Sequence, residues 1–353
     1  MRVLLIKTSS LGDVIHSLPA VTDAARAVPG VRFHWVVEEA FAGIPGWHPA
    51  VERVIPVALR RWRRHPLRAR RDGEWGDFRQ RLADTDYDLV IDAQGLLKSA
   101  WLTRHVAAPV HGPDRHSARE RLASWFYDHR HPVNPDRHAV WRNRTLFAAA
   151  LGYDAEALEG DYGLPVEDFA AEPDRTTLVF LHSTTWVTKH WPERYWRTLA
   201  ERAVADGWKV QLPWGNDLER ARSERLAQGL DGVMVPPRTD LSGLATLLAS
   251  ARACVAVDTG PGHLAAALGV PTLSLFGPTS PARTGAWGPG QVHIASDFPC
   301  APCLSRKCRY RPTQEDRRRH DLETEFPLCF TRLDPHTVWQ RLVELVQGKG
   351  GSR

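Results

Sequence analysis

The segment Val255–Ala265 constrains the fold of this chain more than any other. It reads as an apolar strand, followed by Asp258 and two glycines, Gly260 and Gly262, and then by helix-forming residues. A glycine lets backbone approach a ligand closely, and the first free N–H groups of a helix favour an anion. The junction is therefore typical of a phosphate site in a sheet covered by helices.

The same glycines also satisfy the loose dinucleotide fingerprint Gly-x-Gly-x-x-Ala. That fingerprint normally opens a domain and needs an acid about 20 residues later, on the next strand. Here the next strand, Thr272–Gly277, carries no acid. This favours the diphosphate of a mononucleotide over NAD, and a purely structural glycine turn is the third interpretation.

Strand-like and helix-like segments alternate in both halves of the chain, which predicts an α/β fold with parallel sheets. We expect two Rossmann-like, doubly wound domains facing a central cleft, with an interdomain linker in residues 154–174. The expected parts are residues 1–160, residues 175–335, and a C-terminal helix and flexible tail over 336–353. The segments expected to be extended are 2–8, 32–37, 53–57, 88–93, 177–182, 209–212, 232–235, 253–257 and 272–276, and those expected to be helical include 14–27, 78–83 and 139–151.

Composition and hydropathy predict a cytoplasmic globular protein. No uncharged apolar run reaches the roughly 18 residues expected of a membrane span, and the first apolar segment is too short for a signal peptide. The net charge is only +5, but seven arginines lie between Arg60 and Arg71 around Trp62. A solvated helix face, nucleic acid, and a phosphorylated or carboxylated acceptor at an anionic membrane surface are the three interpretations. We favour the last, since no nucleic-acid motif accompanies the arginines.

The loop after the first strand carries Lys7 and Asp13 at the sheet edge where open α/β folds bind ligands. Asp13 has two interpretations that compete for the same oxygens. It is a helix N-cap, or it is a general base whose pKa rises as the cleft closes and water leaves. Lys7 is a surface lysine or offsets charge beside the reacting group.

Two further charged residues lie at corresponding positions of the second domain. Lys189 follows the first strand of that domain, where a lysine would neutralise a leaving diphosphate. Glu219 follows the next strand and suits a ribose diol, although a solvent-facing acid in the first turn of a helix is an equal alternative.

Seven segments, in order along the chain, resemble the heptosyltransferase I group of glycosyltransferase family 9. They are residues 4–18, 35–39, 51–57, 91–95, 189–192, 212–215 and 257–260. The resemblance implies a GT-B architecture and inverting transfer of L-glycero-D-manno-heptose from ADP-heptose to the Kdo-lipid A inner core of lipopolysaccharide. It also implies an enzyme on the cytoplasmic side of the inner membrane, peripheral to its anionic surface.

The resemblance assigns roles to single residues. Asp13 would be the catalytic base, and Lys189 would stabilise the leaving group. The donor-binding positions would be Thr184, Thr185, Lys189, Glu219, Asp258, Thr259, Gly260 and His263. We expect the acceptor phosphate or Kdo carboxylate to meet Arg60, Arg61, Arg63, Arg64 and Arg119, with Arg121 as a weaker candidate.

Catalysis is expected to need no metal and no other cofactor. No Asp-x-Asp pair stands where a divalent ion would bridge the diphosphate, and Asp84-Thr85-Asp86 lies between a helix and a strand of the first domain. Four cysteines near the C-terminus, Cys300, Cys303, Cys308 and Cys329, depart from the commonest sequences of the group and are similar to tails of heptosyltransferase II. They predict a structural metal, reduced thiols or a disulfide, since their spacing is not that of a standard zinc ribbon.

Other functions remain open at this stage. The second heptosyltransferase or another family 9 transferase is the nearest alternative. A nicotinamide-dependent oxidoreductase and a noncatalytic sugar-nucleotide binding protein are alternatives of other classes.

Overall fold

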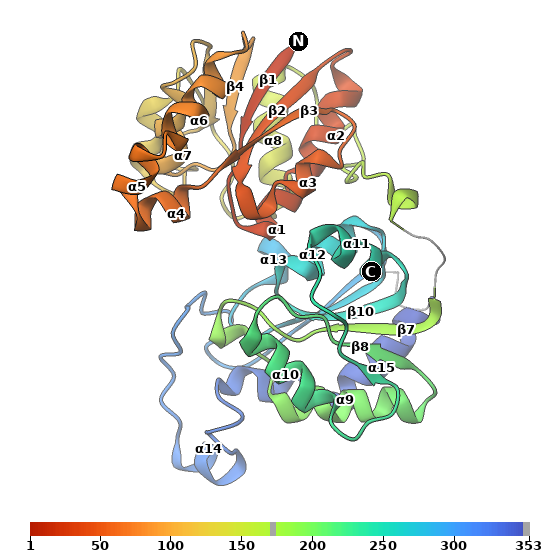
Figure 1. Cartoon of the computed structure of the whole chain (residues 1–353). Helices are drawn as coiled ribbons and strands as arrows, with labels where there is room; N and C mark the ends of the chain where they lie inside the picture. Colours follow the sequence, from red (N-terminus) through yellow and green to blue (C-terminus); the bar gives the residue numbers. More distant parts are fainter. Residues whose placement is uncertain (170–173, 349–353) are drawn as a thin grey trace. The chain divides into compact units, whose positions relative to one another are not determined.

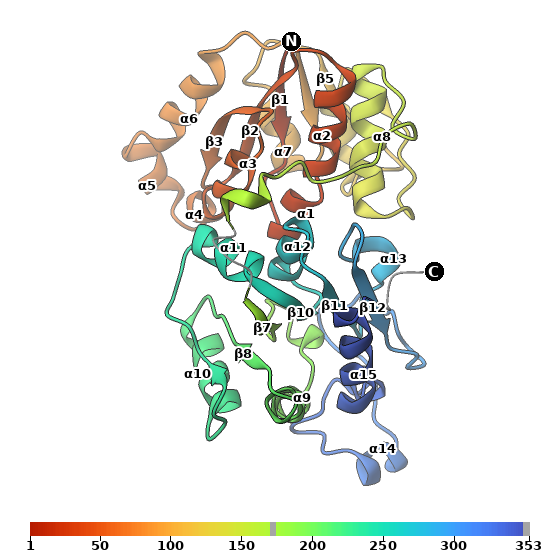
Figure 2. The same ribbon diagram turned by 90° about the vertical axis from the view of Figure 1, so that its right-hand side faces the viewer.

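The structure is a computed structural model that describes residues 1–169 and 174–348. It divides into two compact units, Met1–Pro165 (unit 1) and Val166–Arg353 (unit 2). Each unit is an α/β sandwich built on its own sheet (Figures 1 and 2).

Unit 1 is built on six parallel strands in the order β3-β2-β1-β4-β5-β6. Its elements are β1 (Arg2–Ile6), α1 (Leu11–Ile15), α2 (Leu18–Ala27), β2 (Arg32–Glu38), η1 (Glu39–Phe41), α3 (Gly43–Gly46), β3 (Val51–Val57), α4 (Leu59–Arg64), α5 (Pro66–Arg71), α6 (Glu74–Ala83), β4 (Leu89–Asp92), α7 (Leu97–Thr103), β5 (Val110–Pro113), η2 (Arg121–Phe126), β6 (His129–His131) and α8 (Ala139–Leu151).

The central strand β1 is apolar on both faces because helices cover both sides of the sheet. Leu4 and Ile6 join a buried cluster with Phe78 of α6 and Leu102 of α7. Helices α2 and α8 pack against each other elsewhere in the unit, and Phe147 of α8 lies 5.9 Å from the ring of a β2 phenylalanine.

Unit 2 repeats this arrangement with six parallel strands in the order β12-β11-β10-β7-β8-β9. Its elements are η3 (Val166–Asp168), β7 (Asp174–Leu181), η4 (Val187–Lys189), α9 (Glu193–Ala205), β8 (Lys209–Gln211), α10 (Asp217–Ala227), β9 (Val233–Met234), α11 (Leu241–Ala249), β10 (Ala251–Val257), α12 (Gly260–Ala267), β11 (Thr272–Phe276), α13 (Pro281–Thr284), β12 (Gln291–Ala295), α14 (Gln314–Arg319), η5 (Leu328–Arg332) and α15 (Pro335–Val346).

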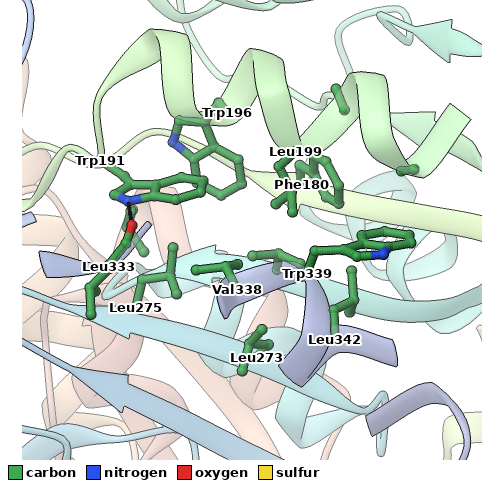
Figure 3. Close-up of a cluster of buried hydrophobic side chains, with 14 of the residues drawn as sticks. Phe180, Trp191, Trp196, Leu199, Leu273, Leu275, Leu333, Val338, Trp339 and Leu342 are labelled. Carbon is green, nitrogen blue, oxygen red and sulfur yellow. Dashed lines mark hydrogen bonds between the residues drawn. The ribbon is translucent and has the colours of Figure 1, made fainter. Parts of the chain in front are cut away.

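The core of unit 2 lies where α9 and α15 pack together on the sheet (Figure 3). Trp191 and Trp196 meet edge to face with ring centroids 5.1 Å apart. The Trp191 indole N–H donates to the Leu333 carbonyl at 2.8 Å, so this tryptophan is both buried and hydrogen-bonded. It fixes the end of the loop that carries Lys189.

The predicted α/β class with two doubly wound sheets is confirmed. The expected helix over 14–27 is wrong in one respect, because it is divided into α1 and α2, with Pro19 near the start of α2. Three strands, β5, β6 and β12, are not predicted, since they are short and rich in polar residues. The C-terminal helix is present as α15 within unit 2, whereas residues 349–353 of the expected tail lie outside the described residues.

In the described part of the chain, no helix is long and apolar enough to cross a membrane.

Candidate functional site

In each unit, several predicted site residues lie at the point where the strand order reverses. In unit 1 this point lies between β1 and β4, and in unit 2 it lies between β7 and β10. Open α/β sheets bind ligands beyond the carboxyl ends of the strands at such a switch point. The loops after β1 and β4 are therefore the candidate site of unit 1, and the loops after β7 and β10 are the candidate site of unit 2.

The carboxylate of Asp13 closes the first turn of α1. Ser10 is the N-cap residue, and it donates to Asp13 Oδ2 from its backbone N–H at 2.8 Å and from its hydroxyl at 2.9 Å. Asp13 is thus the third residue of the helix and part of a capping box, which corrects the expectation that it is itself the N-cap. The guanidinium of Arg119 lies 3.7 Å from the same oxygen.

Positive charge around Asp13 keeps its carboxylate ionised. Burial alone would raise the pKa of Asp13, but Lys7, Arg119 and the hydrogen bonds from Ser10 outweigh it, so that the pKa lies below its ordinary value. The expected rise of this pKa concerns the closed cleft and stays a prediction. Burial lowers the pKa of Lys7 to about 8, and its ammonium donates to the Ala93 carbonyl at 2.6 Å.

The end of β4 holds the loop after β1 in place. Gln94 Oε1 accepts from the backbone N–H of Thr8 at 3.0 Å and of Ser9 at 3.1 Å. Asp92, which is fully buried, accepts from the Gln94 N–H at 2.8 Å and from the Tyr127 hydroxyl at 2.8 Å. The sequence analysis assigns no role to Asp92 or Gln94, although an acid and an amide directly after a buried strand are a signal of this kind.

An ion pair joins the two central loops of unit 2. Lys189 Nζ lies 2.7 Å from Asp258 Oδ2, and His263 Nε2 lies 3.6 Å from Asp258 Oδ1. Burial would raise the pKa of Asp258, but His263 and Lys189 together hold that pKa well below its ordinary value. Three of the predicted donor residues therefore form one largely buried cluster.

Gly262, beside this cluster, has a packing role. Thr259 is the N-cap residue of α12, which begins at Gly260. A Cβ at Gly262 would lie 3.0 Å from the Ala256 Cβ, so the glycine lets the first turn of α12 lie against the end of β10. The Gly260 N–H and the positive end of the α12 dipole follow Asp258 closely, whereas Pro261 has no N–H and the Gly262 N–H donates to the Thr259 carbonyl at 3.1 Å.

The part-buried His190 and the buried Arg222, neither of which is predicted as a site residue, position the loop after β7. Arg222 donates to His190 Nδ1 at 2.9 Å, and the other ring nitrogen of His190 donates to the Thr184 carbonyl at 2.7 Å. Burial lowers the pKa of His190, in keeping with a neutral ring. Thr185 follows on the same loop and is exposed. The sequence Lys189-His190-Trp191-Pro192, which is part of the family resemblance, was the signal that could have pointed to His190.

Glu219 lies in the first turn of α10, after the next strand of the sheet. Its carboxylate accepts from the Gly215 N–H at 2.8 Å, and its charge acts on His190 and Arg222. Glu219 therefore lies beside the loop that carries Thr184. Among the described contacts, Glu219 forms no ion pair with Lys189.

The predicted arginine cluster forms the two short helices α4 and α5. Arg61 is held by two carboxylates, Glu39 at 3.1 Å and Glu74 at 2.6 Å. Arg60 lies 5.4 Å above the ring of Phe41, whereas Arg63 and Arg64 are exposed. Of the five predicted acceptor residues, Arg119 is thus the one placed beside Asp13.

The four C-terminal cysteines line one small pocket of about 20 Å³, together with Thr188. All four are free thiols, and burial with the neighbouring thiols raises the pKa of Cys329 to about 12. Across residues 1–169 and 174–348, no group of three or more His, Cys, Asp or Glu side chains is placed to hold a metal ion. The predicted structural metal therefore has no support here, whereas the clustering of the thiols is confirmed.

Comparisons with known proteins identify the family of the chain. The family model of glycosyltransferase family 9 (heptosyltransferase) matches residues 75–314. The chain is 65% identical over 344 residues to lipopolysaccharide heptosyltransferase 1 of Pseudomonas aeruginosa, covering 97% of each protein. The structure of E. coli heptosyltransferase WaaC with ADP has a TM-score of 0.85 at 43% identity, covering 98% of this chain and 100% of that chain. The complex of the E. coli protein with ADP-2-deoxy-2-fluoro heptose has a TM-score of 0.81 at 44% identity, covering 98% and 99%. The predicted resemblance is confirmed, and the chain belongs to glycosyltransferase family 9, the heptosyltransferases.

Proposed function

We propose that this enzyme transfers L-glycero-D-manno-heptose from ADP-heptose to the Kdo-lipid A inner core of lipopolysaccharide. One observation carries the proposal: Lys189 and Asp258 join the loops after β7 and β10, 2.7 Å apart, directly before the first turn of α12. A cation beside the positive end of a helix dipole suits a diphosphate. The relatives named above are heptosyltransferases, and two of the structures hold ADP or an ADP-heptose analogue.

We assign Asp13 as the general base of an inverting transfer. The acceptor hydroxyl gives its proton to the Asp13 carboxylate while its oxygen forms a bond to the anomeric carbon. The bond from that carbon to the diphosphate oxygen breaks, and ADP leaves with the electron pair. The low pKa of Asp13 supports this role because the carboxylate is ionised at neutral pH.

The leaving diphosphate needs charge stabilisation rather than a proton. Lys189 and the positive end of the α12 dipole would supply it, and Asp258 would orient the lysine. Thr184, Thr185, Thr259 and His263 would complete the donor site, with Glu219 on the ribose. We propose that no divalent metal or other cofactor takes part, since Lys189 already provides the positive charge.

The arginines of unit 1 would bind the anionic groups of the acceptor. Arg119 lies beside Asp13 and is the best placed for a phosphate or Kdo carboxylate. Arg60, Arg61, Arg63 and Arg64 would act with it at a cytoplasmic, anionic inner-membrane surface. Arg61 would first have to exchange its two carboxylate partners for acceptor oxygens.

The test follows ADP release from ADP-heptose and deacylated Kdo₂-lipid A, without added metal. We expect turnover by the wild type and a fall of about 10² or more in kcat for Asp13→Asn, with ADP affinity retained. Asp77→Asn, an exposed acid of α6, is the matched control and should keep its activity. Equal losses in both variants would remove Asp13 from the role of base.

Other outcomes separate the alternatives. ADP release only with an already heptosylated acceptor would reassign the protein to the second heptose. Release with neither acceptor would point to another sugar nucleotide or to a binding protein. Thermal stabilisation by ADP but not by NAD would separate this site from that of a nicotinamide enzyme.

A further inference from the structure

Large apolar side chains are exposed on one part of unit 1. Trp101 and Trp125 are the two exposed tryptophans of the described residues, and Trp125 is 72% exposed. Leu67 is 84% exposed, and Leu97 and Leu122 are exposed as well. Their exposure is unusual, because the surface of a soluble protein rarely gathers large apolar groups.

These side chains lie on neighbouring elements. Leu97 and Trp101 are four residues apart on α7, and Leu122 and Trp125 are three apart on η2, so each pair shares a face. Helix α7 packs against η2. The Glu120 carboxylate, just before η2, accepts from the Leu97 N–H at 2.6 Å, which joins the starts of the two elements.

An aromatic stack connects this surface to the arginine helices. Trp101 stacks on Trp75 of α6 with centroids 4.9 Å apart, and Trp75 meets Trp62 of α4 edge to face at 5.6 Å. Helix α5, which carries Leu67, packs against α6 and α4. Figure 1 shows α4, α5, α6 and α7 together on one side of unit 1.

Positive charge surrounds the exposed apolar groups. Lys98 of α7 lies within electrostatic range of Arg60, Arg63 and Arg119, which help burial to lower the pKa of Lys98. Acids offset part of this charge: Glu38 acts on Lys98 as well, Glu74 accepts from Arg61 and from Trp62, and Asp72 pairs with Arg68 and Arg71. Among these residues, the acids thus leave part of the positive charge of the arginine helices without a counter-charge.

We propose that α4, α5, α7 and η2 form a docking face for an anionic phospholipid bilayer. Tryptophan and leucine side chains enter the region between headgroups and acyl chains, while arginines bind lipid phosphates. The face rests on the proposed function, since it would bring the enzyme to a lipid-anchored acceptor. An acidic soluble protein fits less well, because it offers no apolar layer for Leu67 and Trp125.

The test measures sedimentation with vesicles of phosphatidylethanolamine and phosphatidylglycerol, and with phosphatidylcholine vesicles as the neutral comparison. The variant is Leu67→Ser/Trp125→Ser, and the matched control is Leu218→Ser, an equally exposed leucine (85%) of α10 in unit 2. We expect the wild type and the control to bind anionic vesicles in a salt-sensitive way. The double variant should bind about tenfold or more weakly, since two partly inserted side chains lose burial.

Turnover with the deacylated, water-soluble acceptor separates this inference from the proposed function. We expect the double variant to keep wild-type turnover there, which also shows that it is folded. Wild-type vesicle binding by the double variant, equal loss in Leu218→Ser, or no wild-type binding would overturn the docking face. Absence of turnover in every protein, with vesicle binding as expected, would instead overturn the proposed function alone.

Discussion

Replacement of Arg144 by methionine tests how much the buried ion pair between α2 and α8 contributes to unit 1. Arg144 Nε donates to Asp23 Oδ2 at 2.5 Å, and its Nη2 donates to the carbonyls of Ala155 at 2.6 Å and Leu158 at 2.7 Å. The side chains of Arg144 and Asp23 are 1% and 0% exposed. Arg144→Met leaves two carbonyls and one buried carboxylate without this donor.

The expected loss follows from the uncompensated charge. Removing one partner of a buried pair costs about 3–5 kcal/mol, which for a unit of this size lowers Tm by about 6–20 °C. Replacing both partners, as in Asp23→Leu/Arg144→Met, should recover much of that loss, because an apolar pair of similar volume avoids the charge. Arg26→Met is the matched control, since Arg26 pairs with Asp161 at 2.5 Å but both side chains are about half exposed.

The pH dependence gives an independent check. Burial already raises the pKa of Asp23 despite Arg144, and loss of the arginine raises it further. The raised pKa means that the destabilisation is smallest below the unfolded pKa of the carboxyl, near pH 4, and grows as pH rises through the folded pKa. Calorimetry of the full chain at several pH values, with amide exchange of α2 and α8, measures both effects. A Tm for Arg144→Met within about 2 °C of the Arg26→Met control would refute the reasoning.

Three further predictions concern the candidate site. Lys189→Met should weaken ADP binding by about 10- to 100-fold, because a charged hydrogen bond contributes about 1.5–3 kcal/mol. Adenosine binding, measured by calorimetry like that of ADP, should stay unchanged. Equal losses for both ligands would contradict a contact between Lys189 and the diphosphate. Lys7→Met removes the leading attractive charge on Asp13 and so raises the pKa of Asp13, which should move the acid limb of the kcat/KM profile to higher pH, and an unmoved limb would rule out this coupling. Thr188→Val deletes the 3.0 Å hydrogen bond to the Ser305 carbonyl, and a loss of about 1 kcal/mol in ADP binding is expected if this contact holds the neighbouring Lys189 loop; unchanged ADP binding would argue against it.

Strand periodicity and the glycine junction predict most of the fold. Buried strands such as β1 and β10 are visible as apolar runs because both faces of a parallel sheet are covered. Strands such as β6, with the sequence His129-Arg130-His131, carry no such pattern, because backbone pairing rather than side-chain burial defines them. Periodicity merges α1 with α2, because the apolar residues Val14, Ile15, Leu18 and Val21 keep helical spacing across the break at His16 and Ser17.

For the candidate site, the sequence predicts which charged residues lie in which loops. It does not predict which of these residues form ion pairs with one another. The proximity of Lys189 to Asp258 depends on the switch point between β7 and β10, two strands that are neighbours in the sheet although β8 and β9 lie between them in the chain. The ion pairs of Arg61 with Glu39 and Glu74 cannot be predicted from the sequence for a similar reason, since the two carboxylates come from other helices. The order of strands in the sheet must be known before such neighbours can be named.

Because of the thiol pocket, the oxidation state of the cysteines after purification and storage must be controlled in any assay of this enzyme. Cys300 and Cys303 are exposed, and they line the same pocket as Thr188, one residue before Lys189. An alkyl group or dye attached to either thiol would have to share a space with room for little more than one water molecule. Oxidation of these thiols during storage without a reductant would change side chains that line this pocket, one residue away from Lys189.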